Sequence, residues 1–492
     1  MTENAPRVPT ASMKRTLVAL AILGASSGAG QSAAAQLTLR EALHEADHSA
    51  YANRVAAGNS AAQSAEVLRP LKGILPSVRF EAGYIRTTDP IGVFGTTLRQ
   101  RTITQANFDP HRLNYPGAVS NYQSGIVVEQ PLFNAEAWTG RRAAVHMADA
   151  GRATEEWSQL STRVDLVQAY YGVVLAAERA GTLRAAARAA SAHLVQAQAM
   201  VRQGLVTKSD ELLASVRASD IDAQLAEAEG ASATARRQLA VLLGGDGRAS
   251  PLALQLPTAM PSGDRIRAVV AGDTASLVPL ERADVRAASS GLDAARADAL
   301  RARSTFLPRL NSFARFDWNS TDRPYGGDRN WTVGVLASWT IFAGMSDFGD
   351  VRATAGRTSA AQAQAEAARA SARLDVEQSR TALGVALTRL GIAERATVQS
   401  AEAHRIVGRK YAGGLATVVE LLDAQATELQ SALALSQARW SAIAAAAERL
   451  RALGLDPAVL AALDDAADVN TAADSLPMRG GDRTSTDSSR TP

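Results

Sequence analysis

Two carboxylates three positions apart, Glu420 and Asp423, follow a pair of glycines inside a helix-forming region. They belong to the segment YAGGLATVVELLDAQ, residues 411–425, and a similar segment, VRQGLVTKSDELLAS, occupies residues 201–215. Residues three apart lie on the same side of a helix, so the two acids would form one negative surface. Such a surface attracts cations within a Debye length of about 8 Å.

The same segments contain the signals of a turn between two helices. Gly204 and Gly414 suit a turn that a β-carbon would obstruct. A threonine three residues after each glycine suits a helix N-cap, and an acid three residues further completes a capping box; the pairs are Thr207 with Asp210 and Thr417 with Glu420. Capping is therefore a second explanation for Asp210 and Glu420, but it gives Asp423 no role.

The composition excludes several classes of protein. Lys plus Arg number 52 and Asp plus Glu 49, and no basic block is interleaved with aromatic residues, which argues against nucleic-acid binding. The chain has no cysteine, so it has no thiolate nucleophile and no thiolate metal site. His44 and His48 are four residues apart without a third clustered ligand, so a solvated helix face explains them better than a metal site. We find no catalytic constellation or phosphate-binding loop, and we expect neither an enzyme nor a cofactor.

The N-terminus has the features of an export signal. Lys14 and Arg15 precede the apolar stretch TLVALAILGA, which is followed by small residues ending at Ala35. This order is typical of a cleaved signal peptide, which we place at residues 1–35, with Met13 as an alternative start. No later stretch reaches the roughly 18 apolar residues of a spanning helix. We expect an exported protein.

The mature chain repeats its order of landmarks once. Leu75-Pro76 corresponds to Leu307-Pro308, and the two Gly-Leu-x-Thr segments correspond to each other. We predict a first repeat at 36–245 with its helical turn near 204–207, a linker at 246–275, a second repeat at 276–455 with its turn near 413–417, and a largely disordered C-terminal segment at 456–492. The first repeat carries about 23 extra residues after its Leu-Pro landmark, within PIGVFGTTLRQRTITQANFDPHRLNYPG. Their Pro, Gly, Asn and Asp content predicts a loop.

Each repeat contains two short segments in which apolar and polar residues alternate. Alternation is the signal of a strand, and it predicts strands at about 76–88, 122–133, 308–320 and 331–342. Segments of about ten residues suit tilted membrane strands. Four strands are too few for a closed barrel, which needs eight or more, so we expect an oligomer to complete it.

Long helices follow the strands. Residues 136–203 and 343–410 contain no proline, and at 1.5 Å per residue each run would reach roughly 100 Å as one helix. Their apolar positions are small and lack the Leu/Ile heptad seam of an ordinary coiled coil. The fold class that we predict is mixed and mostly α: a long α-helical barrel joined to a transmembrane β-barrel with four strands per protomer.

The arrangement resembles the TolC-like outer membrane efflux protein family over about residues 37–455. The resemblance rests on LTLREALHEA, the two Leu-Pro strand entries, QPLF and the paired Gly-Leu-x-Thr segments, all in order. It implies a homotrimer with a twelve-stranded barrel in outer-membrane lipid and a helical tunnel in the periplasm of a Gram-negative cell. It also implies a periplasmic adaptor protein and an inner-membrane transporter as partners.

The resemblance also assigns roles to the turn residues. It places Glu420 and Asp423 in acidic rings at the tip constriction, and Asp210 and Tyr411 at positions that latch neighbouring hairpins. It implies adaptor docking at the turns, formed by Gly204, Leu205, Thr207, Gly414, Leu415 and Thr417. The basic latch residue of the best-known member falls at Ala416 here, so its ion pair cannot form; Lys208 and Arg409 are candidate substitutes.

We therefore expect the trimeric exit duct of a tripartite efflux or type I secretion system, which conducts substrates passively. The alternative from another class is a non-conducting helical adhesin or scaffold at the cell surface. The cargo stays open, because drugs, metal ions and polypeptides are all compatible with this sequence.

Overall fold

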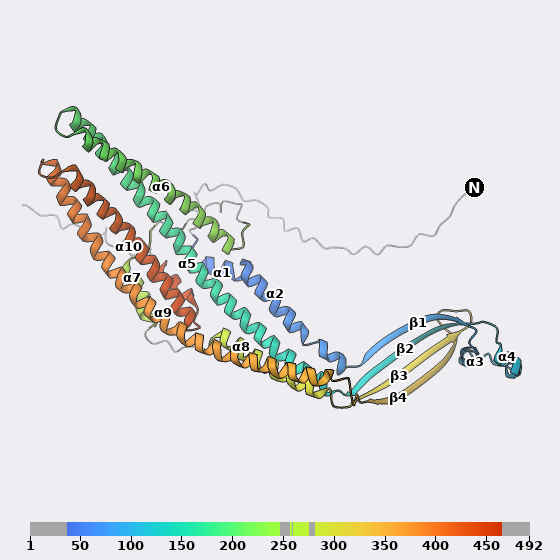
Figure 1. Ribbon diagram of the computed structural model, residues 1–492. Coiled ribbons are helices and arrows are strands. Elements are labelled where there is room, and N and C mark those ends of the chain that lie inside the picture. Colours follow the sequence, from blue (N-terminus) through green and yellow to red (C-terminus); the bar gives the residue numbers. More distant parts are fainter. Residues whose placement is uncertain (1–36, 247–255, 258, 275–280, 465–492) are drawn as a thin grey trace, which may run out of the picture. The chain divides into compact units, whose positions relative to one another are not determined.

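A computed structural model describes residues 37–246, 256–257, 259–274 and 281–464. Within these ranges it contains one antiparallel sheet and a set of helices that includes two of exceptional length (Figure 1). The elements in chain order are α1 Leu39–Ser49, α2 Tyr51–Glu66, η1 Arg69–Gly73, β1 Ser77–Thr87, α3 Pro90–Arg99, η2 Gln105–Phe108, α4 Pro110–Asn114, β2 Val119–Phe133, α5 Ala135–Arg202, α6 Lys208–Leu242, α7 Gly263–Thr274, α8 Ala283–Ser304, β3 Arg309–Ser320, β4 Asp328–Ser338, α9 Ser346–Ala412, α10 Val418–Ala452 and η3 Pro457–Leu463. The predicted signal peptide lies outside the described residues.

The long proline-free runs each form one continuous helix, as predicted. α5 has 68 residues and α9 has 67, and each is followed, after a tight turn, by a helix of 35 residues. α5 packs along α6, α8, α2 and α10, and α9 packs along α10 and α8. A rise of 1.5 Å per residue makes α5 and α9 about 100 Å long. A single residue, Asn134, separates β2 from α5, so the first turn of α5 adjoins the sheet and its last turn adjoins the hairpin turn.

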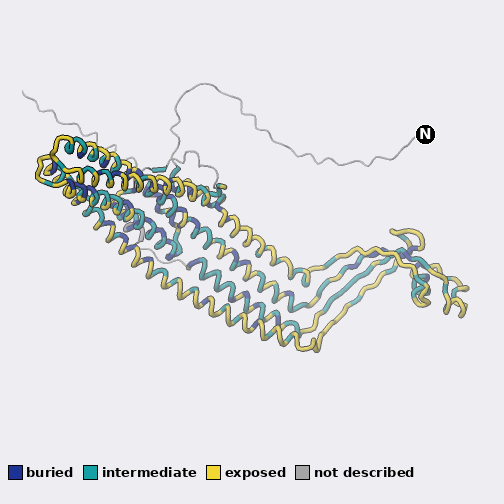
Figure 2. The backbone as a smooth tube through the Cα atoms, turned by 45° about the horizontal axis from the view of Figure 1, so that its top comes forward, coloured by how far each residue is buried: buried dark blue, intermediate teal, exposed yellow. Residues whose placement is uncertain are grey.

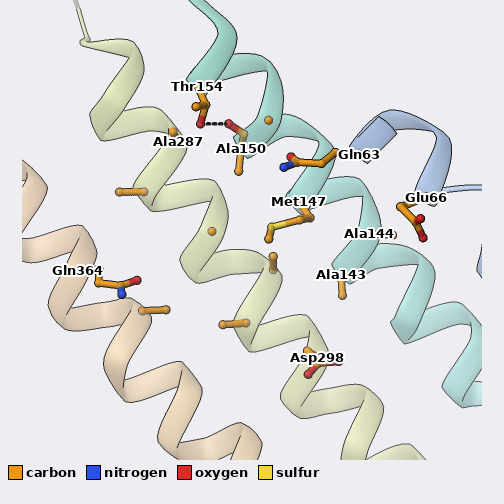
Figure 3. A pocket seen from close by; sticks show the side chains of 16 residues that line it. Gln63, Glu66, Ala143, Ala144, Met147, Ala150, Thr154, Ala287, Asp298 and Gln364 are labelled. Atoms are coloured by element: carbon orange, nitrogen blue, oxygen red, sulfur yellow. Dashed lines mark hydrogen bonds between the residues drawn. The ribbon is translucent and has the colours of Figure 1, made fainter. Parts of the chain in front are cut away.

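Many buried positions along these helices are alanine, glycine or serine, which lets the helix backbones approach closely. An open groove between α2, α5, α8 and α9 shows this packing, since half of its lining residues are alanines, among them Ala143, Ala150 and Ala287 (Figure 3). Gln63, Asp298 and Gln364 are among its few polar lining residues. The groove therefore offers apolar surface with little means of orienting a ligand.

The main hydrophobic core lies around the middle of α5. Tyr170 and Tyr171 are 0% and 1% exposed there and pack with residues of α1, α10 and η3. Both phenols donate hydrogen bonds to the carboxylate of Asp464, at 2.8 and 2.9 Å, and the backbone N–H of Leu39 donates to the same carboxylate at 2.9 Å. Burial raises the pKa of both tyrosines, and the charge of Asp464 raises it further, so both phenols stay protonated donors.

The sheet has the order β1-β2-β3-β4, and all its pairs are antiparallel. Phe80 pairs with Ile126, Ile126 with Phe316, and Phe316 with Trp331, which places one row of large apolar side chains across all four strands. The face that carries this row is exposed; Trp331 is 69% exposed. We call it the apolar face.

The opposite face of the sheet carries charges, and we call it the polar face. Arg79 forms an ion pair with Glu129 at 2.7 Å, and Arg315 forms ion pairs with Asp317 at 2.8 Å and with Glu81 at 3.5 Å. Among the described residues, the outer edges of β1 and β4 have no partner strand, and both strands are largely exposed (Figure 2). The sheet is thus amphipathic and open at both edges.

Five boundaries or assignments differ from the sequence-based expectations. β4 ends at Ser338 rather than near 342, because its pairing with β3 ends there although the alternation continues, and β2 begins at Val119, slightly early. The predicted loop after β1 contains α3 and α4. The linker contains α7, and the C-terminal segment begins with η3, whose Leu460 and Leu463 are buried; the rest of that segment lies outside the described residues.

Candidate functional site

The two hairpin turns end their long helices in the same way. Gly204 has φ +70° and Gly414 has φ +73°, a left-handed conformation that glycine adopts without strain. The residue after each glycine donates its backbone N–H five residues back, from Leu205 to Met200 at 2.9 Å and from Leu415 to Lys410 at 2.8 Å. This pattern is a Schellman motif. The glycines therefore stop α5 and α9 and reverse the chain, as predicted.

A capping box starts each returning helix. Glu420 accepts hydrogen bonds from the backbone N–H of Thr417 at 2.7 Å and from its hydroxyl at 3.2 Å. Asp210 does the same for Thr207, at 2.9 and 2.8 Å. In return, each threonine hydroxyl accepts a hydrogen bond from the backbone N–H of the acid. The capping role of both acids is confirmed.

Asp423 has no part in this cap. Its carboxylate is exposed and makes no hydrogen bond or ion pair with any residue that the structure describes, while its backbone carbonyl accepts from Thr427 within α10. The opposite side of this helix end is buried through Val418, Leu421 and Leu422. Glu420 and Asp423 are therefore adjacent on the solvent side of α10, where they form an exposed acidic surface.

Tyr411 joins the two hairpins near their turns. It is buried, and its hydroxyl donates to the sulfur of Met200 on α5 at 3.5 Å. Burial raises the pKa of Tyr411, and the negative charge of Asp210 raises it further. Asp210 thus lies near enough to act on the phenol electrostatically, although no hydrogen bond joins the two in the described part of the chain.

Ala416, at the position of the expected basic latch residue, is partly buried against the apolar cluster around Tyr411 and Leu421. Lys208, one candidate substitute, forms an ion pair with Glu211 of its own helix at 2.6 Å. Ala416 therefore makes a hydrophobic contact within its own protomer, at the position where the resemblance implies a positively charged residue. Among the described residues, Lys208 is not part of the apolar cluster around Tyr411.

Each turn also exposes a leucine at its apex. Leu205 is 65% exposed and Leu415 is 82% exposed. Both follow their glycines directly, so the Schellman turn directs them away from the helices. An exposed apolar side chain at each tip is a suitable anchor for another protein.

The described residues contain no group of three or more His, Cys, Asp or Glu side chains suited to hold a metal ion. His44 and His48 contact each other edge to face on α1, with ring centroids 5.4 Å apart. None of the described helices is both long and apolar enough to cross a membrane.

The cap of α10 should loosen in acid. Its hydrogen bonds with Thr417 lower the pKa of Glu420, so the cap contributes stability above the ordinary carboxyl pKa of about 4.3 and loses it as the pH falls through the lowered value. We expect the protection of amides near Thr417 against exchange, corrected for the intrinsic pH dependence of amide exchange, to fall between about pH 5 and pH 3. Glu420→Gln keeps an uncharged acceptor and should remove this dependence; an equal pH dependence in both proteins at matched pH would contradict the assignment.

Comparison with known proteins shows the same organisation. The family model described as Outer membrane efflux protein matches residues 74–245 and 275–454. Among curated proteins, the alkaline protease secretion protein AprF of Pseudomonas aeruginosa is 27% identical over 259 residues, which are 50% of each chain. The chain thus aligns with about half the length of this curated relative.

Solved structures share the fold at low identity. The Campylobacter jejuni CmeC outer membrane channel has a TM-score of 0.71 at 17% identity, with 85% of each chain covered. The open state of the Neisseria gonorrhoeae MtrE outer membrane channel has a TM-score of 0.67 at 20% identity, covering 85% of this chain and 89% of that one. Because the family model covers well over half of the sequence, in two segments that include both hairpins and all four strands, this chain belongs to the outer membrane efflux protein family.

Proposed function

We propose that this protein is the trimeric exit duct of an efflux or secretion system and carries cargo passively through the outer membrane. The observation that carries the proposal is the amphipathic sheet with two unpaired edges. The sheet has an exposed apolar face on one side and a network of ion pairs on the other. Such a sheet is suited to separate lipid from water, as the wall of a membrane barrel does. An open sheet cannot stay unpaired in lipid, so β1 of one copy must pair with β4 of another.

Three copies of four strands give a barrel of twelve, an even number in the range of outer-membrane barrels. α5 and α9, about 100 Å long, then continue the duct from the barrel into the periplasm. Cargo would enter between the hairpin turns, where an adaptor protein and an inner-membrane transporter dock on Leu205 and Leu415. A passive duct needs no catalytic site, and its energy comes from the transporter.

A surface adhesin with the same helices is the alternative function. An adhesin would have no use for a charged network on the face of the sheet that lies opposite the apolar one. The names of the relatives favour transport, since one is a protease secretion protein and two are outer membrane channels. These names do not point to one common cargo, so our proposal does not specify which substrate the duct carries.

Glu420 and Asp423 are the proposed constriction of this duct. In the trimer, six carboxylates would surround a narrow axis, and those within a Debye length of about 8 Å would act together on passing ions. We expect the Glu420→Gln, Asp423→Asn double variant to lose most of its cation selectivity at neutral pH, as measured by reversal potentials across a salt gradient in planar bilayers.

At low pH, where protonation already weakens the rings, the double variant and the unaltered protein should differ little. Glu402→Gln is a matched control on α9, since that acid is exposed and paired with Arg405 outside the turn. Unchanged ion selectivity in the double variant would place the constriction elsewhere.

A further inference from the structure

The connection between β1 and β2 is a folded unit, unlike its counterpart between β3 and β4. Residues 88–118 form α3, η2 and α4 beside the end of the sheet, whereas residues 321–327 form a short turn (Figure 1). Asp89 caps α3 by accepting the backbone N–H of Gly92 at 2.6 Å, and the rings of Phe94 and Phe108 pack edge to face with centroids 5.9 Å apart. We call residues 88–118 the insert.

Buried amides fasten the insert to the sheet. Gln100 donates from Nε2 to the backbone carbonyl of Ser120 at 2.8 Å and to Oδ1 of Asn121 at 2.9 Å. Asn121 donates in turn from Nδ2 to Oδ1 of Asn319 on β3 at 2.8 Å. Gln100 and Asn121 are both 3% exposed, so moving the insert away would break both bonds of Gln100 and leave Oδ1 of Asn121 without this donor, whereas the bond between Asn121 and Asn319 lies within the sheet.

A second set of contacts reaches the edge strand. Arg101 donates to the backbone carbonyl of Arg329 at 3.2 Å and lies 3.8 Å from the carboxylate of Asp328. Asn330 donates to the backbone carbonyl of Arg99 at 3.4 Å. The insert is thus bonded to both β2 and β4, and this attachment at two strands indicates a fixed position rather than a mobile one.

The amide chain identifies the face on which the insert lies. Asn319 pairs with Gln123 in the β2–β3 register, and Asp317, two residues before Asn319, pairs with Gly125. Side chains two apart on a strand point to the same face. Asn319 and Asn121 therefore share the polar face with Asp317 and Arg315, and the insert is anchored on that face, at the end of the sheet away from α5.

We propose that the insert is a fixed lid over the outer mouth of the duct, which limits the size of what can pass. This inference rests on the proposed function, because the polar face becomes the lumen only when the barrel closes. Three lids would then project over one opening. The buried amide chain holds each lid in place, so the outer mouth is narrowed permanently, independently of the state of the hairpin turns.

The test uses the absence of native cysteines. Thr332→Cys places a thiol on the polar face, opposite Arg315, and Val333→Cys places one on the apolar face of the same strand. Each is introduced into the full chain and into a lidless variant in which residues 88–118 are replaced by the sequence of residues 321–327. Intact cells are treated from outside with a small charged maleimide or with a maleimide on a polyethylene glycol of several kilodaltons.

We expect the small reagent to label Thr332→Cys in both backgrounds, and the large reagent to label it only in the lidless one. Equal labelling by the large reagent in both would overturn the lid and leave the duct intact. If the small reagent labels Val333→Cys but not Thr332→Cys, the apolar face would line the water-filled side and the polar face would not. That result would overturn the duct itself. If the lidless variant does not reach the membrane, Gln100→Ala removes two bonds of the anchor. It should increase labelling by the large reagent, and no increase would overturn the lid.

Discussion

Val333→Arg should prevent most of the protein from assembling in the outer membrane, whereas Thr332→Arg, one residue earlier, should assemble. Val333 lies in the middle of β4 on the apolar face, in a row with Ala314 and Val128. An arginine facing lipid at this depth costs about 2–4 kcal/mol in each copy. The measurement is the amount of folded protein in the outer-membrane fraction.

The two variants differ in face but carry the same charge, so they form a matched pair. Thr332→Arg lies directly opposite Arg315, but a like-charged cross-strand neighbour costs at most roughly 1 kcal/mol and Glu81 and Asp317 lie close by. The difference between the faces should therefore exceed the local repulsion. Equal assembly of both variants would show that the apolar face does not meet lipid.

Asp464→Ala should lower the free energy of unfolding by about 3–5 kcal/mol, because it removes one acceptor from three buried donors. Tyr171 loses its hydrogen bond, Tyr170 keeps only the carbonyl of Leu37, and the N–H of Leu39 loses its partner. Each buried donor left without a partner costs about 1–3 kcal/mol. Denaturant unfolding of the purified protein, followed by the fluorescence of its tryptophans, measures the loss.

A double-mutant cycle separates this network from general damage. Tyr171→Phe removes the donor as well as the bond, and replacing both partners is much less costly than orphaning one. Asp464→Ala should therefore destabilise the Tyr171→Phe background clearly less than it destabilises the original chain. Identical losses in the two backgrounds would show that the carboxylate does not stabilise the core through this tyrosine.

The parts of the fold that follow from local pattern were predictable. Proline-free runs predicted α5 and α9 as single helices, and alternation of apolar and polar residues predicted all four strands. The end of β4 was not predictable from alternation, since Trp339 and Ile341 continue the pattern after pairing with β3 has ended. A strand ends where its hydrogen-bonded partner strand ends, and the sequence of the strand itself does not contain this information.

The sequence predicts a loop for the insert, because prolines and glycines interrupt regular structure, and this prediction is wrong. Both of its α-helices in fact begin with an aspartate N-cap followed by proline, at Asp89-Pro90 and Asp109-Pro110. Proline is favoured at the first position of a helix, so this signal was available in the sequence. Its attachment to the sheet, from Gln100 to Asn121 and from Arg101 to Arg329, was not predictable, because no local pattern connects residues that far apart.

At the hairpin turns, the glycine and threonine spacing predicted the turns and caps, because both depend on neighbours within six residues. The contact between Tyr411 and Met200 joins positions 211 apart in sequence and could not be foreseen. The same is true of Asp464, which meets Tyr170 and Tyr171 only because η3 folds back onto α5. The roles of Glu420 and Asp423 in a closed ring stay predictions that depend on the trimer.

The trimeric duct is tested most directly by the conductance of the purified, unaltered protein in a planar bilayer, with its mass determined in the same detergent preparation. The account predicts particles with the mass of three chains that insert as discrete, cation-selective conductance steps. Particles of three chains that never conduct, including after Glu420→Gln and Asp423→Asn are introduced together to weaken the constriction, would contradict it and favour the adhesin.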